Sequence, residues 1–175
     1  MVFISFGSVG VELLQQAIKV MANTYTQLYV HIVFAVKDRA CLVAQSWKSR
    51  IERYIAGVIN NRGHKLYIIN AQPDHVHLLV SLDPNDALSD AVRDIKSSSS
   101  RFINEEKLVH GHFQWQEGYG AFSCSQSSVA RVVEYIKNQD SHHGSRSFID
   151  EYRILLRKYD IAFDEQYIFK AVENS

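Results

Sequence analysis

The sequence predicts an α+β fold, ferredoxin-like or RRM-like, in which an antiparallel sheet carries helices on one face. Two observations support this prediction. Apolar residues recur with a period of two in some segments, as in strands, and with a period of about 3.6 in others, as in helices. The resulting order is strand, helix, strand, strand, helix, strand, helix, and no repeat, linker or low-complexity run suggests a second domain.

The composition is that of one globular domain. The chain has 175 residues, 46% of them hydrophobic and 22% charged, which is enough to bury a core without disulfides. No apolar run approaches the roughly 20 residues of a membrane-spanning helix, and Cys41 and Cys124 suggest no disulfide framework. We therefore expect a cytoplasmic protein with no membrane partner. Because the formal net charge is +0, any nucleic-acid binding must come from local basic stripes.

The first half of the chain supplies three strands and a helix. Residues 26–36 alternate apolar side chains as a strand does, and residues 47–58 repeat them at helical spacing. Residues 66–71 form a second strand, and Pro73-Asp74 then turns the chain. The third strand, at residues 75–80, is therefore expected beside the second in antiparallel orientation.

A long helix with two different faces comes next, from about residue 86 to residue 105. Its apolar residues cluster on one side, and the other side is basic and hydroxylated, with Arg93, Lys96 and Arg101. An ordinary solvated face has the same pattern. Beside a phosphate-processing site, the stripe would instead bind the backbone of a nucleic acid.

Residues 114–125 combine aromatic residues, glycines and a short alternating strand. Gly118 and Gly120 permit tight backbone geometry. Tyr119, which lies between these glycines, or Trp115, which precedes them, can stack on a base. Such aromatic residues more often belong to the core. A helix with a buried valine and isoleucine stripe comes after this strand, and a last amphipathic segment comes after the helix.

Two histidines share one face of the third strand. Because successive side chains of a strand point to opposite faces, His75 and His77 converge on one outer patch while Val76 lies on the other side. Their Cα atoms would be about 6.6 Å apart at about 3.3 Å per residue, close enough for both rings to bind one metal ion. A solvated polar surface is the alternative. His31, on the first strand, is expected near this patch without binding a metal.

A second pair of polar residues lies on the helix that covers residues 129–139. Tyr135 and Gln139 are separated by the i,i+4 spacing that stacks side chains on one helix face. Tyr135 also lies away from the apolar stripe, so the core does not require it. A tyrosine can act as a nucleophile, and a glutamine can supply a neutral oxygen ligand.

Four motifs occur in this order: HIVFAVKDR, PDHVHLLV, GYGAFSCSQS and VEYIKNQDSHH. Together they resemble the single-tyrosine HUH transposases, small enzymes of bacterial and archaeal insertion sequences that move as single-stranded DNA, with relatives associated with repetitive extragenic palindromes (REP). The resemblance implies one domain over residues 24–169, a tail over residues 170–175, and an extension over residues 1–23 outside the core fold. A peripheral helix over residues 11–20 is a competing interpretation.

The resemblance also implies roles for individual residues. His75 and His77 match the metal ligands of the HUH motif, Tyr135 matches the nucleophile, and Gln139 matches the third metal ligand. The implied partners are single-stranded DNA with hairpins and a second copy of the chain in a homodimer.

Other residues are candidates for contact with DNA. Residues 35–39 stand where many relatives have a Thr-Lys-Tyr-Arg-like run, so Lys37 and Arg39 are less closely matched to the family than the site residues. His142 and His143 belong to the last motif, where they can cap a helix or contact phosphate.

The predicted chemistry can also be built from the residue types. A divalent ion held by two imidazoles and an amide oxygen keeps its full charge for a phosphodiester, and such a mixed set suits Mg²⁺ or Mn²⁺ better than structural zinc. Attack by Tyr135 would leave a covalent 5′-phosphotyrosine and a 3′-OH that can reseal the strand.

Three other functions remain open at this point. One is a replication or relaxase-type HUH nickase, and another is a domesticated relative that no longer mobilises its own gene. The third is a non-catalytic RRM-like module, which would give no reason for His75, His77, Tyr135 and Gln139 to converge.

Overall fold

The computed structural model describes residues 25–39, 42–139, 147–165 and 168. The expected N-terminal extension and C-terminal tail lie outside these residues, as do His142 and His143. None of the helices in the described part of the chain has the length and apolar composition that crossing a bilayer requires.

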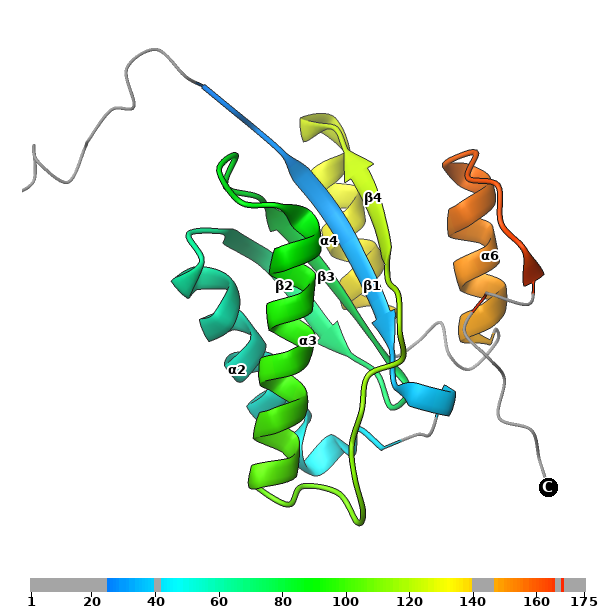
Figure 1. Ribbon diagram of the computed structural model, residues 1–175. Helices are drawn as coiled ribbons and strands as arrows, with labels where there is room; N and C mark the ends of the chain where they lie inside the picture. The colour runs from blue at the N-terminus through cyan, green and yellow to red at the C-terminus, as the bar shows by residue number, and fades with distance from the viewer. Residues whose placement is uncertain (1–24, 40–41, 140–146, 166–167, 169–175) are drawn as a thin grey trace, which may run out of the picture.

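Four antiparallel strands form one sheet, which confirms the predicted α+β class (Figure 1). The strands are β1 (Tyr29–Ala35), β2 (Lys65–Ala71), β3 (His75–Ser81) and β4 (Gly120–Cys124), in the order β2-β3-β1-β4. The helices are α2 (Gln45–Asn61), α3 (Leu88–Glu105), α4 (Val129–Lys137) and α6 (Phe148–Lys158), with short 3₁₀ turns at Lys37–Arg39 and Gln126–Ser128. As expected, β2 and β3 are antiparallel neighbours.

The helices cover both faces of the sheet, whereas the sequence analysis placed them on one. In Figure 1, α2 and α3 lie in front of the sheet and α4 lies behind it. The apolar side of α4 packs on Leu79 through Val132 and Ile136. On the same side, α6 packs on Val33 and Phe122 of β1 and β4. Hydrophobic periodicity shows that a helix has a buried side but does not say which face of the sheet it covers.

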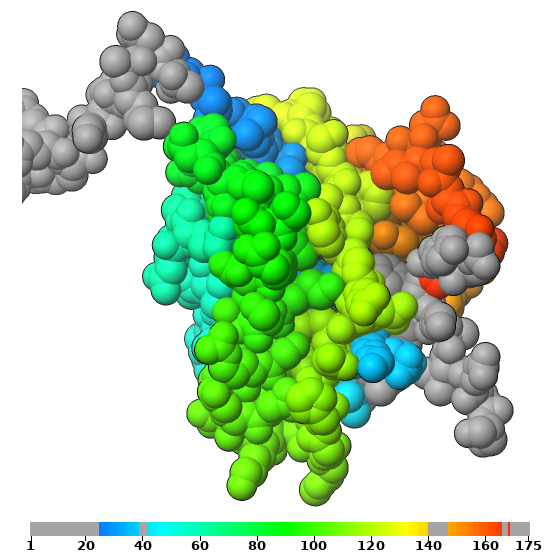
Figure 2. Space-filling view, in the orientation of Figure 1, coloured from blue at the N-terminus to red at the C-terminus, as the bar shows by residue number. Residues whose placement is uncertain are grey.

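The segment between α3 and β4 is fastened to α3 by side chains. Asn104 accepts a hydrogen bond from Phe113 N at 2.7 Å and donates one to Phe113 O at 2.9 Å. The Trp115 indole donates to Ser99 Oγ at 2.8 Å. These bonds hold residues 112–119 alongside α3; Figure 2 shows α3 in green and this segment in yellow-green.

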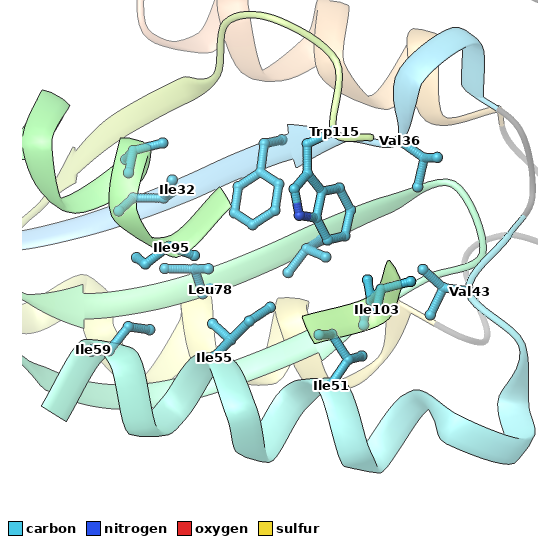
Figure 3. Packing of buried hydrophobic residues seen from close by; sticks show 14 of the residues in the cluster. Ile32, Val36, Val43, Ile51, Ile55, Ile59, Leu78, Ile95, Ile103 and Trp115 are labelled. Atoms are coloured by element: carbon cyan, nitrogen blue, oxygen red, sulfur yellow. The ribbon is translucent and has the colours of Figure 1, made fainter. Parts of the chain in front are cut away.

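The main core lies between the sheet and the pair α2 and α3 (Figure 3). On α2, the i,i+4 repeat of Trp47, Ile51, Ile55 and Ile59 places one buried row against the sheet. Each fully buried isoleucine contributes roughly 1.5–3 kcal/mol relative to an exposed one. Because Val76, Leu78 and Val80 face this core, the alternation of β3 sends His75 and His77 to the opposite face.

Candidate active site

The two histidines of β3 lie side by side beneath α6. Their ring centroids are 4.9 Å apart, and His75 Nδ1 is 2.7 Å from Asp74 Oδ1. Both side chains are 0% exposed, whereas the sequence analysis placed them on an outer patch. The difference arises because Phe148, at the start of α6, stacks on the His75 ring at 4.0 Å between centroids.

His31 of β1 contacts the second of these histidines. A hydrogen bond of 2.9 Å joins His31 Nε2 and His77 Nδ1. Burial, and to a smaller extent the charge of Lys158, lowers the pKa of His31 to about 4. The ring is therefore neutral near pH 7, and this hydrogen bond helps to hold the His77 ring.

The segment containing Tyr135 and Gln139 brings both side chains to the same place. Val132 and Ile136 pack α4 on the sheet, and Asn70 Nδ2 donates to Ile136 O at 2.9 Å, which ties the end of the helix to β2. The half-buried Tyr135 ring lies 6.1 Å from the His77 ring, between centroids. Gln139, just beyond the end of α4, is fully buried. The structure thus brings all four site residues predicted from the sequence into one cluster.

Glu151 of α6 is a fifth member of this cluster and was not among the residues expected from the sequence. Its Oε1 atom accepts hydrogen bonds from the Tyr135 hydroxyl and, at 2.7 Å, from Gln139 Nε2. The same atom is 3.4 Å from His77 Nε2. A signal was present in the sequence, since Glu151 is a carboxylate within the apolar stripe that includes Phe148, Tyr152 and Leu155.

The donor atoms in this cluster fit a divalent metal ion. Possible ligand atoms of His75, His77 and Glu151 all lie within 4.8 Å of one another. Gln139 Oε1 is buried and has no hydrogen-bond partner among the residues described here. Two imidazoles with carboxylate or amide oxygens are a donor set suited to a divalent ion.

Four of the predicted DNA contacts line a groove of about 870 Å³ between α3 and residues 112–119. Arg93 pairs with Asp90 at 2.8 Å, and Lys96 Nζ donates to two backbone carbonyls, Gln116 O at 2.6 Å and Gly118 O at 2.7 Å. Burial lowers the pKa of Lys96. The other two predicted contacts in the lining are Arg101 and Tyr119. Lys96 therefore fastens the wall of the groove, while Arg101 is exposed.

Lys37 lies beside a smaller hollow next to this groove. Its Nζ donates to Gln114 Oε1 at 3.2 Å, and the hollow is lined by Lys37, Asp38 and residues 114–117. The side chain of Arg39 is outside the described residues. Since α3 packs on the face of the sheet opposite the histidines, the groove and the five-residue cluster lie on different sides of the sheet.

Comparison with known proteins identifies the family. Residues 24–139 match the model of the family described as "Transposase IS200 like". The chain belongs to this family. The match confirms the predicted resemblance, and it makes the chain an IS200-like transposase, which implies a DNA-cleaving enzyme. Glu151 and the whole of α6 lie beyond the matched residues.

Individual transposases are also similar to this chain. ISDra2 transposase TnpA of Deinococcus radiodurans is 29% identical over 119 residues, which are 65% of this chain and 84% of that protein. A crystal structure of a transposase candidate from Deinococcus radiodurans R1 superposes with a TM-score of 0.55 at 24% identity, covering 70% of this chain and 98% of that one. The structure of a REP-associated tyrosine transposase bound to a REP hairpin superposes with a TM-score of 0.53 at 18% identity, covering 81% of this chain and 90% of that one. The two structures bear on the fold alone.

Proposed function

We propose that this transposase cleaves and rejoins single-stranded DNA at hairpin-marked ends of an insertion sequence, through a covalent 5′-phosphotyrosine and with a divalent metal. The observation that carries the proposal is the convergence of the Tyr135 hydroxyl with Gln139, His75 and His77 in one buried cluster. A non-catalytic binding module has no need of this arrangement.

Tyr135 is the nucleophile in this proposal. Its hydroxyl oxygen forms a bond to phosphorus while the bond from phosphorus to the 3′ oxygen breaks, which leaves the 5′ phosphate on the tyrosine and a free 3′-OH on the DNA. One diester replaces another, so an incoming 3′-OH can reverse the exchange without ATP. Cleavage and joining are therefore one reaction in two directions.

His75, His77 and Gln139 would hold Mg²⁺ or Mn²⁺. When bound, such an ion withdraws charge from the phosphoryl oxygens and stabilises the departing 3′ oxygen. The surrounding residues prepare the site: Asp74 fixes the His75 ring through Nδ1, and His31 fixes the His77 ring in the same way. Contacts of this kind set the tautomer of a metal-binding histidine.

The groove beside α3 is the proposed surface for the DNA hairpin. Arg101 and Arg93 offer positive charge to phosphates, Tyr119 offers a ring for stacking, and Lys37 extends the basic surface toward the adjoining hollow. Arg39 is a further proposed DNA contact. The hairpin bound by the REP-associated relative supports this class of ligand. Because the groove and Tyr135 are on opposite sides of the sheet, the hairpin would lie on one side and its single-stranded extension would reach the other.

The test is the formation of a covalent adduct. The chain is incubated with labelled single-stranded DNA from the flanks of its gene and with Mn²⁺ or Mg²⁺, and the products are run on a denaturing gel. We expect an adduct that needs metal and is absent in Tyr135→Phe. Binding of the correct hairpins without any adduct would favour the non-catalytic RRM-like alternative.

Three further points of the proposal have separate tests. Hairpins that flank the gene itself would indicate an active element, whereas hairpins scattered through the genome would indicate a domesticated relative. The proposed homodimer is tested by light scattering of the chain with and without DNA. A single nick at one site, which converts supercoiled double-stranded plasmid to the relaxed circle, would instead favour a relaxase-type nickase.

A further inference from the structure

Glu151 is a buried carboxylate whose partners among the described residues carry no fixed positive charge. Its side chain is 11% exposed, and its contacts are the Tyr135 hydroxyl, the Gln139 amide and the His77 ring. Among the ion pairs found within the described residues, none joins Glu151 to a lysine or arginine. A carboxylate that is taken out of water needs a compensating charge. A glutamine would make the same two hydrogen bonds, so hydrogen bonding alone does not explain an acid here.

We propose that Glu151 is an anionic ligand of the metal ion at this site, so that α6 completes a metal centre begun by β3. This inference rests on the proposed metal-dependent reaction, and it concerns a residue outside the part of the chain that matches the family. With Glu151 as a ligand, the ligand shell of the ion carries one negative charge, whereas two imidazoles and an amide alone would be neutral.

The distances agree with this assignment. Neighbouring ligands around an ion at about 2.1 Å are roughly 3 Å apart, and opposite ligands are roughly 4.2 Å apart. Glu151 Oε1 is 3.4 Å from His77 Nε2, which fits neighbouring ligands. The full set with His75 spans no more than 4.8 Å, so shifts of a few tenths of an ångström suffice.

The same oxygen also connects the ion to the nucleophile. Glu151 Oε1 accepts hydrogen bonds from the Tyr135 hydroxyl and from Gln139 Nε2, which use the two lone pairs of that oxygen, so a cation would take the place of the Gln139 hydrogen bond while the Tyr135 bond stays. Glu151 would therefore hold the ion with the same oxygen that positions the Tyr135 hydroxyl. The first turn of α6 can supply this ligand because Phe148 is packed on the His75 ring.

The experiment measures Mn²⁺ binding to the full chain without DNA, by titration calorimetry. Wild type is compared with Glu151→Gln, which keeps the shape and the acceptor but removes the charge. Glu134→Gln is the matched control, since Glu134 is an exposed acid on α4 next to Tyr135 in sequence. We expect Glu151→Gln to weaken Mn²⁺ binding by at least about tenfold and Glu134→Gln to leave it unchanged.

A melting curve in EDTA shows whether each variant is folded before metal is added. If Glu151→Gln melts early, the assay is repeated with Glu151→Asp, which keeps the charge; Mn²⁺ should then raise its melting temperature. Wild-type affinity in Glu151→Gln would overturn the inference, as would equal losses in both glutamine variants or no Mn²⁺ binding to the wild type. The adduct assay with Tyr135→Phe decides the proposed function separately, since it can succeed where Mn²⁺ titration fails.

Discussion

His31 makes the stability of the metal-free protein depend on pH in a way that one substitution can isolate. The ring is 2% exposed, and burial lowers its pKa from an ordinary 6.5 to about 4. In the unfolded chain the same ring takes up a proton near pH 6.5. Between these two values the unfolded state therefore binds more protons, so acid favours unfolding. The contribution of His31 is fully present above pH 6.5 and is lost as the pH falls toward 4.

The size of this effect can be worked out from the two pKa values. The difference between 6.5 and about 4 corresponds to at most about 3 kcal/mol, of which about 2 kcal/mol is lost between pH 7 and pH 4.5. The informative substitution is His31→Gln, because the glutamine amide reaches about as far as Nε2. It can keep the hydrogen bond to His77 Nδ1, and it does not titrate.

The assay is urea unfolding in EDTA at pH 7 and pH 4.5 for both proteins. The wild type should lose about 2 kcal/mol more than His31→Gln over this interval, because the other titrating groups are common to both. Equal urea m-values in the two proteins and at the two pH values would show that each unfolding transition exposes the same amount of surface. If both proteins lost the same stability, the buried neutral state of His31 would be refuted.

Three other substitutions test the groove and the packing of α6. Lys96→Met removes two hydrogen bonds to the segment 116–118, so the free energy of unfolding should fall by about 2 kcal/mol. Limited proteolysis should also cut that segment sooner, and unchanged cleavage would contradict the role of Lys96 in fastening it. Gly120→Ala places a Cβ 2.7 Å from the Tyr152 ring and should lower stability by about 1–3 kcal/mol in a melting experiment, which an unshifted curve would disprove. Arg101→Gln should weaken DNA binding at every sequence and reduce the salt slope by about 1, whereas an equal slope would remove this residue from the binding surface.

The parts of the fold that repeat locally were predictable from the sequence. The period of two in β3 gave the shared face of His75 and His77, and the four-residue repeat on α2 gave its buried row. The turn at Pro73-Asp74 gave the antiparallel pairing of β2 with β3. In each case the signal lies within a few residues of the structure that it specifies.

The parts that depend on tertiary packing were not predictable in the same way. Alternation fixed the direction of the two histidines, but it carried no information about the cover that α6 places over them. Glu151 meets Tyr135 across 16 positions of sequence and Gln139 across 12. The basic stripe was placed correctly on α3, but the use of Lys96 to fasten its neighbouring segment depends on how residues 116–118 return along the helix.

The candidate active site is divided between the region that matches the family and the C-terminal helix. β3 and α4 lie within residues 24–139 and bring the imidazoles, the hydroxyl and the amide together. They supply no carboxylate to the cluster apart from Asp74 at its edge. α6 adds the carboxylate of Glu151 at the point where the other groups meet. In the proposed metal centre, a change in the C-terminal helix would therefore alter the charge of the site while the proposed nucleophile and the imidazoles stay the same.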